Sequence, residues 1–579
     1  MNTIPRPEYP RPQMVRDEWL NLNGEWQFEI DHGRSGKERS LYAPEAALQD
    51  RIIVPFCPES KLSGVHYTDF MDAVWYKRVF TLPAQWNGQR IWLHFGAVDY
   101  DTEVWINGTS VGTHRGGYSS FSFDITHMVV PGDNVVTVCA GDDVRSPLQP
   151  RGKQSEQLHS HACDYTRTTG IWQTVWVECV PLTSISSFKL IADPDNGCVH
   201  LQANVAGDTN ACVLEAEASH RGRPVGSSAA ILSGSSLRLT IPLDEVCLWE
   251  PGHPELYDLQ LTIRRNDAAI DSVQSYFGLR SVKLDGMAFR LNGKSVFQRL
   301  VLDQGFYPDG IYTAPTDDDL RRDIEISMNL GFNGARLHEK VFEPRFLYWA
   351  DRLGYLVWGE YANWGLDITS AAGLERFLPE WLETINRDFN HPSIIGWCPF
   401  NETWDADGKK QNDEILRIVH SVTKLVDPTR PVIDTSGNYH VVTDIFDVHD
   451  YDQNPDTFRE KYEPMKHGGP AFVTFPERQA YEGQPYFVSE YGGIWWNPGQ
   501  TDGHGWGYGD RPTSEPEFIE RYGKLTSTLL DHPMMCGFCY TQLYDIEQEV
   551  NGLCTYDRKP KFDPGLIRRI NTRKAAIED

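Results

Sequence analysis

The sequence of 579 residues lacks long hydrophobic runs and lacks an excess of positive charge. No stretch approaches the roughly 20 apolar residues that a membrane-spanning helix needs, and the first residues contain no apolar segment typical of a secretory signal. The formal net charge of −27 would repel nucleic acids and anionic membrane surfaces. We therefore expect no nucleic-acid partner and no membrane association, and we expect the ligand to be neutral.

The sequence also lacks the regular cysteine spacing of a disulfide framework. Its eleven cysteines, an odd number, are scattered from Cys57 to Cys554, which favours free thiols in a reducing compartment. We therefore predict a cytoplasmic protein. Cys536 and Cys539 form a CxxC pair, but the chain has no second such pair and this one lies in an apolar run. Buried thiols are expected there, rather than a zinc or redox site.

Three segments of different sequence pattern divide the chain, which is too long for one hydrophobic core. Residues 1–182 contain short alternating runs, such as Trp75–Phe80, separated by turn dipeptides, which predicts an N-terminal jelly-roll-like β-sandwich. Residues 183–277 repeat this pattern at the length of an immunoglobulin-like β-sandwich. Residues 278–579 alternate strand-like runs with amphipathic helices, which predicts a C-terminal (β/α)8 TIM barrel.

The third segment contains eight candidate strands, the number that closes a barrel. They are Val296–Leu302, Gly334–His338, Tyr355–Glu360, Ile394–Asn401, Pro431–Thr435, Ile445–Tyr451, Tyr486–Glu490 and Met535–Gln542. Helices are predicted between them, among them Asp317–Leu330, which a cap at Thr316 begins, and Glu343–Leu353, which Gly354 ends. Because barrel active sites lie where strands end at the carboxyl face, the residues at these ends are the candidate site.

Two of these strand ends carry a glutamate. Glu402 follows the fourth strand and Glu490 ends the seventh, and these two strands lie on facing walls of a barrel. Glycosidic cleavage requires two opposed carboxyl groups, because one protonates the leaving oxygen while the other attacks the anomeric carbon or activates water. The apolar residues before Glu402 are expected to raise its pKa, and a nearby arginine to keep Glu490 ionised. The pair predicts a glycoside hydrolase with Glu402 as the acid.

Ordered motifs run through the first and third segments. They are Asn21–Phe28, Trp75–Phe80, Phe95–Gly108, Gly117–Asp124, Gly170–Glu178, Asn333–His338, Asn401-Glu402, Ser489–Gly492 and Gly552–Lys561. In these motifs the sequence resembles glycoside hydrolase family 2, the β-galactosidase, β-glucuronidase and β-mannosidase family, over nearly its whole length. The resemblance implies a sandwich, an immunoglobulin-like domain and a barrel in that order, with Glu402 as acid/base and Glu490 as nucleophile.

The same resemblance implies further residues of the site. Asn401 resembles the asparagine that bonds the sugar's 2-hydroxyl, and Arg336 the arginine held against the nucleophile. His338 matches a histidine of the family's site and shares a strand face with Arg336, since the two are two residues apart. His449 and Tyr451 end the sixth strand on one face, where the family places a tyrosine close to the nucleophile.

Several positions bear on which sugar is bound. Trp364, in the loop after the third strand, is the aromatic residue best placed to stack on a sugar face. Strand eight carries Thr541 where the family commonly has a tryptophan, and Leu300–Gln304 replaces a run typical of β-galactosidases. The Asn-x-Lys with which glucuronidases grip the sugar's carboxylate is missing after Glu490. These departures concern specificity rather than the reaction.

These features predict an exo-acting retaining glycoside hydrolase that releases a terminal neutral sugar, with a β-galactoside as first choice. The alternatives within the family are a β-glucuronidase and a pentose- or furanose-specific glycosidase. A non-catalytic carbohydrate-binding protein would lack one of the two glutamates, and a barrel enzyme of another chemistry would carry a phosphate loop or clustered metal ligands. The expected partner is an oligosaccharide or glycoside, with no cofactor and no metal; the oligomeric state is open, a homo-oligomer included.

Overall fold

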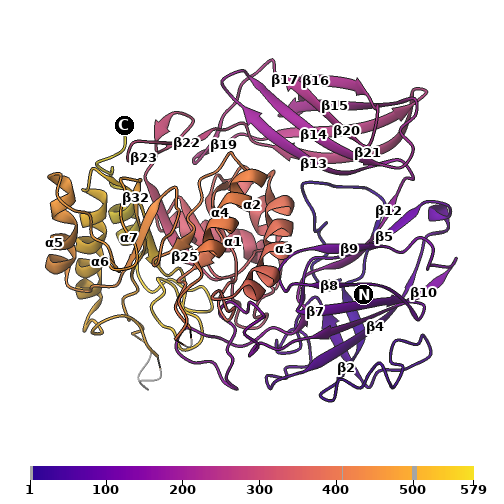
Figure 1. Cartoon of the computed structure of the whole chain (residues 1–579), viewed down its shortest axis with the longest axis horizontal. Coiled ribbons are helices and arrows are strands. Elements are labelled where there is room, and N and C mark those ends of the chain that lie inside the picture. The colour runs from indigo at the N-terminus through magenta and orange to yellow at the C-terminus, as the bar shows by residue number, and fades with distance from the viewer. Residues whose placement is uncertain (1–3, 407, 499–504) are drawn as a thin grey trace.

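The computed structural model describes residues 4–406, 408–498 and 505–579. Figure 1 shows two β-sandwiches, drawn in indigo and magenta, beside a larger body of helices and strands that runs from pink through orange to yellow. Within the described residues no helix is both long enough and apolar enough to cross a membrane. The three bodies follow one another along the chain in the order that the sequence predicts.

The first body is a sandwich of two antiparallel sheets. One sheet has the order β1-β12-β5-β9, formed by Trp19–Asn21, Val175–Val180, Arg90–Phe95 and Phe121–Asp124. The other has the order β3-β2-β4-β10-β7-β8, formed by Asp50–Val54, Gly24–Ile30, Ala73–Thr81, Asp133–Gly141, Asp101–Ile106 and Thr109–Arg115. A short pair joins β6 (Val98–Asp99) to β11 (Gly170–Ile171). Apolar side chains of both sheets, Phe28 and Leu93 among them, form one core.

The second body is a smaller sandwich of the immunoglobulin type, with seven strands in two sheets. The first sheet has the order β13-β14-β17 (Ser184–Asp193, Cys198–Ala206 and Ser236–Pro242), and the second has the order β16-β15-β20-β21 (Arg223–Ile231, Cys212–His220, Tyr257–Arg265 and Ala268–Phe277). Along β15 every second residue is buried, because successive side chains of a strand point to opposite faces. The alternation seen in the sequence therefore means that one face of the strand packs on the core of this sandwich.

The third body is a TIM barrel. Its sheet has seven parallel strands in the order β28-β27-β26-β25-β33-β32-β31, and a short parallel pair, β29 with β30, lies after β28 in the chain. The strands are β25 (Gln298–Asp303), β26 (Gly334–Leu337), β27 (Leu356–Glu360), β28 (Ile394–Cys398), β29 (Phe400–Asn401), β30 (Thr435–Ser436), β31 (Phe446–Asp450), β32 (Tyr486–Gly492) and β33 (Met535–Thr541). Strands β22 (Val282–Asp285), β23 (Ala288–Leu291) and β24 (Lys294–Ser295) lead into it.

Helices connect and cover the barrel strands. They are α1 (Asp317–Asn329), α2 (Pro344–Leu353), α3 (Ala371–Asp388), α4 (Asp413–Val426), α5 (Pro455–Lys466), α6 (Glu515–Leu530) and α7 (Pro564–Asn571). The predicted start of the first helix and the predicted end of the second are confirmed. A capping box between Thr316 and Asp319 begins α1, and Gly354, with a φ of 73°, ends α2. Figure 1 shows helices such as α3 and α6 on the outside of the barrel.

The predicted fifth strand, Pro431–Thr435, is only partly correct. The structure has a strand only at Thr435–Ser436, together with a single bridge from Trp397 to Val432. Strand four is itself broken at Pro399, between β28 and β29. Proline has no N–H to donate, so the ladder between strands four and five is interrupted there. The other seven predicted strands match observed strands, with ends that differ by a few residues.

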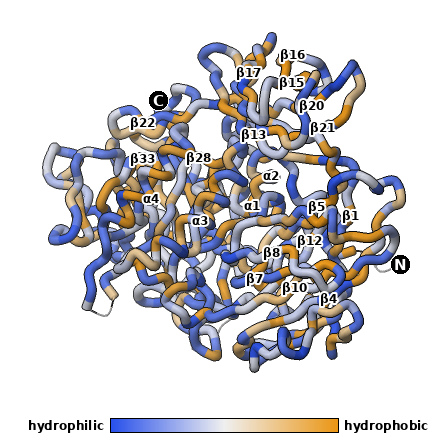
Figure 2. The backbone as a smooth tube through the Cα atoms, turned by 45° about the vertical axis from the view of Figure 1, so that its right-hand side comes forward, coloured by the Kyte–Doolittle hydropathy of each residue, from blue (hydrophilic) through white to orange (hydrophobic). Residues whose placement is uncertain are grey.

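Two hydrophobic clusters lie on the two faces of the barrel strands. On β25, Leu300 and Leu302 belong to an inner cluster, whereas Val301 belongs to the larger cluster shared with the helices. The strands are therefore buried on both faces, and Figure 2 shows much of β33 as hydrophobic. Cys536 and Cys539 are buried on β33, and all eleven cysteines are free, as expected from the sequence.

A segment of the first sandwich, residues 147–167, lies across the carboxyl end of the barrel. Arg151 N donates to Trp364 O at 2.8 Å, and the side-chain amide of Gln548 donates to Ala162 O, also at 2.8 Å. Trp364 and Gln548 belong to barrel loops after different strands. The first sandwich therefore contributes to the end of the barrel at which active sites are found.

Candidate active site

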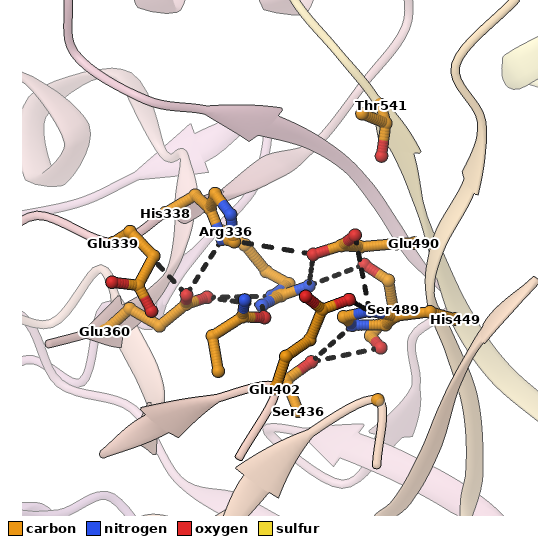
Figure 3. Close-up of polar contacts among 12 residues, drawn as sticks. Arg336, His338, Glu339, Glu360, Glu402, Ser436, His449, Ser489, Glu490 and Thr541 are labelled. Carbon is orange, nitrogen blue, oxygen red and sulfur yellow. Dashed lines mark hydrogen bonds and ion pairs between the residues drawn. The ribbon is translucent and has the colours of Figure 1, made fainter. Parts of the chain in front are cut away.

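Glu402 and Glu490 lie opposite each other at the carboxyl end of the barrel (Figure 3). Glu402 follows β29, and Glu490 lies within β32. One carboxylate oxygen of each, together with a ring nitrogen of His449, lies within 4.8 Å of the others. Glu402 has a φ of 45°, a left-handed conformation that is costly for a residue with a side chain and that occurs at active sites as well as in turns. The structure therefore brings together the two glutamates that the sequence singled out.

Glu490 accepts hydrogen bonds from two side chains. Arg336 Nη1 lies 3.2 Å from Oε1, and the hydroxyl of Tyr451 donates to Oε2 at 2.6 Å. Tyr451 also contacts Thr541 Oγ1 at 3.0 Å, and its ring stacks on that of Tyr508. Donors to both oxygens stabilise the charged carboxylate and fix its orientation, which is what a nucleophile needs.

Arg336 connects three acceptors around the nucleophile. Besides Glu490 it pairs with Glu360 at 2.7 Å, donates to the backbone oxygen of Ser489 at 2.8 Å and donates to Asn401 Oδ1 at 3.2 Å. The bond to Oδ1 fixes the orientation of the Asn401 side chain. Its Nδ2 has no hydrogen-bond partner among the described residues and can donate to a sugar hydroxyl.

His449 lies between the two glutamates. Its Nδ1 is 2.8 Å from Glu402 Oε1 and 3.3 Å from Glu490 Oε2. On the other side Nε2 lies 3.0 Å from Ser436 Oγ, which donates to Asp447 Oδ2 at 2.6 Å. Burial opposes protonation, but the charges of Glu490 and Glu402 outweigh it and raise the pKa of His449. Both ring nitrogens can therefore donate, as in an imidazolium.

The expected increase in the pKa of Glu402 is wrong for the free protein. Burial raises it, but the hydrogen bond and charge of His449 and the charge of Lys153 outweigh burial and lower the pKa of Glu402 to about 2. The apolar residues before Glu402 do not enclose its carboxyl group, because Trp397 and Phe400 pack in the larger cluster that the barrel strands share with the helices. The side chain of Glu402 is 24% exposed. The two shifts favour the His449 side of the pair for the proton that it shares with Glu402.

The remaining predicted residues, His338 and Trp364, contact other protein groups. His338 Nδ1 lies 3.0 Å from Glu360 Oε1 and 4.0 Å from Glu490 Oε1, and burial with the nearby charge of Lys153 lowers its pKa well below the usual value. His338 is therefore neutral. Trp364 Nε1 donates to the backbone oxygen of Asn401 at 3.2 Å, and a sugar-stacking role for its ring stays a prediction.

Three site residues were missed by the sequence analysis. Glu360, at the end of β27, pairs with Arg336, and Glu339, directly after His338, is 1% exposed. The signal for both was the one that pointed to Glu402 and Glu490, a carboxylate at a strand end. Lys153, whose ammonium group lies 3.4 Å from the ring centre of Trp364, comes from the first sandwich. No local pattern connects it to the barrel.

The arrangement supports acid–base and nucleophilic chemistry. Glu402 and His449 share a proton at one side of the site, and Glu490 presents an oriented carboxylate at the other. The same three side chains are close enough to hold a metal ion. A proton on His449 accounts for their spacing equally well. Paired carboxyl groups at the carboxyl end of a barrel are the arrangement of a glycoside hydrolase.

Comparison with known families agrees with this class. Models of the glycosyl hydrolases family 2 match residues 20–181 (sugar binding domain), 183–280 (the family 2 model without further description) and 310–573 (TIM barrel domain). The chain belongs to glycosyl hydrolase family 2. The resemblance inferred from the sequence motifs is therefore confirmed.

Similar proteins include both glucuronidases and a galactosidase. A β-glucuronidase of Paenibacillus borealis is 25% identical over 73% of this chain and 74% of that protein. A putative β-glucuronidase of Formosa agariphila is 28% identical over 62% of this chain, and a β-galactosidase of Thermoanaerobacter pseudethanolicus is 25% identical over 67%. The matched regions span 44% and 52% of the length of the last two.

Solved structures share the fold. A β-glucuronidase from Ruminococcus gnavus in complex with D-glucuronic acid has a TM-score of 0.78 at 19% identity, and the match covers 98% of this chain and 99% of that one. A β-glucuronidase from Bifidobacterium dentium complexed with coumarin-3-O-glucuronide has a TM-score of 0.80 at 20% identity, covering 97% and 98%. Both contain the same three-domain architecture over almost their full length.

Proposed function

We propose that this protein is an exo-acting, retaining β-glycosidase of the β-glucuronidase type. The observation that carries the mechanism is the separation of Glu402 and Glu490, whose nearest carboxylate oxygens are within 4.8 Å. Retaining enzymes hold their two carboxyl groups about 5–5.5 Å apart, whereas inverting enzymes leave about 6.5–9.5 Å for a water molecule. The geometry therefore favours direct attack by a carboxylate.

In this mechanism Glu490 attacks the anomeric carbon while Glu402 protonates the departing oxygen. Arg336 and Tyr451 hold the attacking carboxylate, and the proton reaches Glu402 from His449 through their hydrogen bond of 2.8 Å. The attack forms a covalent bond between the sugar and Glu490. Glu402, now a base, then takes a proton from a water molecule as its oxygen attacks the anomeric carbon. The bond between this carbon and Glu490 breaks, which releases the sugar and restores the Glu490 carboxylate.

The glucuronide assignment rests mainly on similar proteins. The relatives and solved structures named above are mostly β-glucuronidases, so the neutral sugar favoured by the sequence, with galactose first, now has the weaker support. One relative is a β-galactosidase, and the chain lacks the Asn-x-Lys of glucuronidases after Glu490. A neutral hexose is therefore the second candidate substrate.

Rates on matched substrates test the proposal. The measurement is kcat/KM for 4-nitrophenyl β-glucuronide, β-galactoside, β-mannoside, β-galactofuranoside and α-L-arabinoside under one condition. We expect the glucuronide to lead by about tenfold or more, which corresponds to roughly 1.4 kcal/mol of transition-state binding. A lead of the galactoside would restore the neutral-sugar prediction, and a lead of the furanoside or arabinoside would favour the third alternative.

A further inference from the structure

Lys153 brings a positive charge from the first sandwich to the catalytic end of the barrel. It lies within residues 147–167, where Arg151 N donates to Trp364 O at 2.8 Å. Gly152 has a φ of 58°, and a Cβ there would lie 2.4 Å from a backbone oxygen of the barrel. Only glycine fits this approach without strain. The backbone next to Lys153 is therefore held directly against the barrel.

The ammonium group of Lys153 has no hydrogen bond or ion pair with any residue that the structure describes. Lys153 is 6% exposed, and its Nζ lies 3.4 Å from the ring centre of Trp364. The ring N–H of Trp364 in turn donates a hydrogen bond to the backbone oxygen of Asn401, the residue before Glu402. Burial of an ammonium group without hydrogen-bond acceptors costs free energy, and the contact with an aromatic ring offsets only part of this cost. An anionic ligand would supply the missing acceptors.

The other positive groups of the site already have protein partners. Arg336 is paired with Glu360 at 2.7 Å and with the nucleophile, and Arg151 is paired with Asp164. The imidazole of His449 lies between the two catalytic glutamates. Among the described residues near the catalytic pair, Lys153 is the cation left with donors to offer a ligand.

Besides Glu402 and Asp164, two acidic residues lie close to Lys153, and neither of these two cancels its charge fully. Burial raises the pKa of Glu339 well above its usual value, and its Oε1 has no hydrogen-bond partner in the described chain. Burial also raises the pKa of Glu549, which accepts a hydrogen bond from the hydroxyl of Tyr165. Both shifts favour the uncharged carboxyl group, which can itself donate to a ligand.

We propose that Lys153 binds the carboxylate of the terminal sugar, so that a residue of the first sandwich selects uronic acids. This inference rests on the proposed function. After Glu490 the chain lacks the Asn-x-Lys with which glucuronidases grip this carboxylate, so another cation would take its place. An ammonium donates strong charge-assisted hydrogen bonds to a carboxylate. Lys153 meets this need from outside the barrel.

The test compares two substrates that differ only at C6, 4-nitrophenyl β-glucuronide and 4-nitrophenyl β-glucoside, in full-length variants. Lys153→Met should lower kcat/KM for the glucuronide by about 10- to 100-fold, the effect of losing a hydrogen bond to a charged group, and change the glucoside by less than about threefold. Lys153→Arg should keep most of the glucuronide activity. Lys559→Met, at a lysine with a 75% exposed side chain, is the matched control and should change neither rate.

Titration calorimetry with D-glucuronic acid gives a second readout, and its dissociation constant should rise in Lys153→Met by a similar factor. If the wild type prefers the glucuronide but Lys153→Met keeps the same preference, the role of Lys153 is wrong while the proposed function stands. If Lys153→Met lowers kcat/KM equally for both substrates, Lys153 acts on Glu402 or stabilises the fold, and the inference is likewise wrong. If the wild type does not prefer the glucuronide, the proposed function fails and this inference fails with it.

Discussion

His449 determines where the proton of the acid/base pair lies. It contacts both glutamates, and its second nitrogen is supported by Ser436 and through it by Asp447. The charge of this imidazolium explains why Glu402 has a low pKa despite burial. A low pKa alone would make Glu402 a poor acid at neutral pH. As a pair with His449, it has a proton available to a much higher pH.

Replacement of His449 tests this pairing. The raised pKa of His449 keeps the shared proton bound as the pH rises, so His449→Asn should move the alkaline limb of kcat/KM to lower pH. The shift should be seen with substrates whose leaving group needs a proton. It should be absent with dinitrophenyl glycosides, whose leaving group needs none. An alkaline limb that does not move for the first kind of substrate would mean that His449 does not hold the proton.

Replacement of each of the two glutamates should reduce activity in a different way. Glu402→Ala should lose about 10²- to 10⁴-fold on substrates with a poor leaving group, the usual contribution of a general acid, and much less on activated ones. Glu490→Ala should lose activity on every substrate, and azide should restore turnover with inverted product. Comparable losses of both variants on both kinds of substrate would contradict the assigned roles.

The loop between β30 and β31 supports the side of the candidate site that holds Glu402 and His449. Its His440 is 7% exposed and lies between Asp434 Oδ1, at 2.7 Å, and Asp447 Oδ1, at 3.1 Å. Burial opposes its protonation, but the two aspartates raise the pKa of His440 to about 10. Asp447 also accepts from Ser436, so this ion cluster fixes the groups behind His449.

Removal of the imidazole should destabilise the barrel. His440→Gln leaves two buried aspartates without their cation, a change that costs about 3–5 kcal/mol in buried pairs. Since the pKa is raised from 6.5 to about 10 on folding, the stabilisation is fully present below pH 6.5 and is lost as the pH rises through about 10. The thermal midpoint of the variant should therefore lie below that of the wild type at pH 6 and approach it above pH 10.

His467→Gln is the matched control, because the side chain of this histidine at the end of α5 is 75% exposed. Its thermal midpoint should equal that of the wild type at both pH values. A difference between His440→Gln and wild type that stays constant up to pH 10.5 would contradict the charge-based explanation.

Strand positions were predictable where a residue pattern determines them. Apolar runs that end in polar residues located seven barrel strands and placed both glutamates at the correct end, because side-chain alternation and burial are local properties. The fifth strand was overestimated, since its pairing depends on the break at Pro399 in the neighbouring strand. The pKa of Glu402 was predicted in the wrong direction for the same kind of reason. It depends on His449, which is distant in sequence.

The first sandwich takes part in the proposed active site. Residues 147–167 cross the barrel end, where Lys153 lies over the ring of Trp364 and Tyr165 donates to Glu549. Nothing in the sequence around Lys153 indicates this, because it results from how two domains pack. The domain boundaries at 182 and 277 and the cytoplasmic location stay predictions.

In the proposed mechanism Glu490, rather than a water molecule, attacks the anomeric carbon in the first step and forms a covalent bond to the sugar. The most direct measurement is proton NMR of the anomeric signals during hydrolysis of a β-glucuronide, or of whichever β-glycoside is cleaved fastest. With carboxylate oxygens within 4.8 Å, the first product should be the β-anomer, followed by slow mutarotation to the α-anomer. An α-anomer as first product would contradict the account.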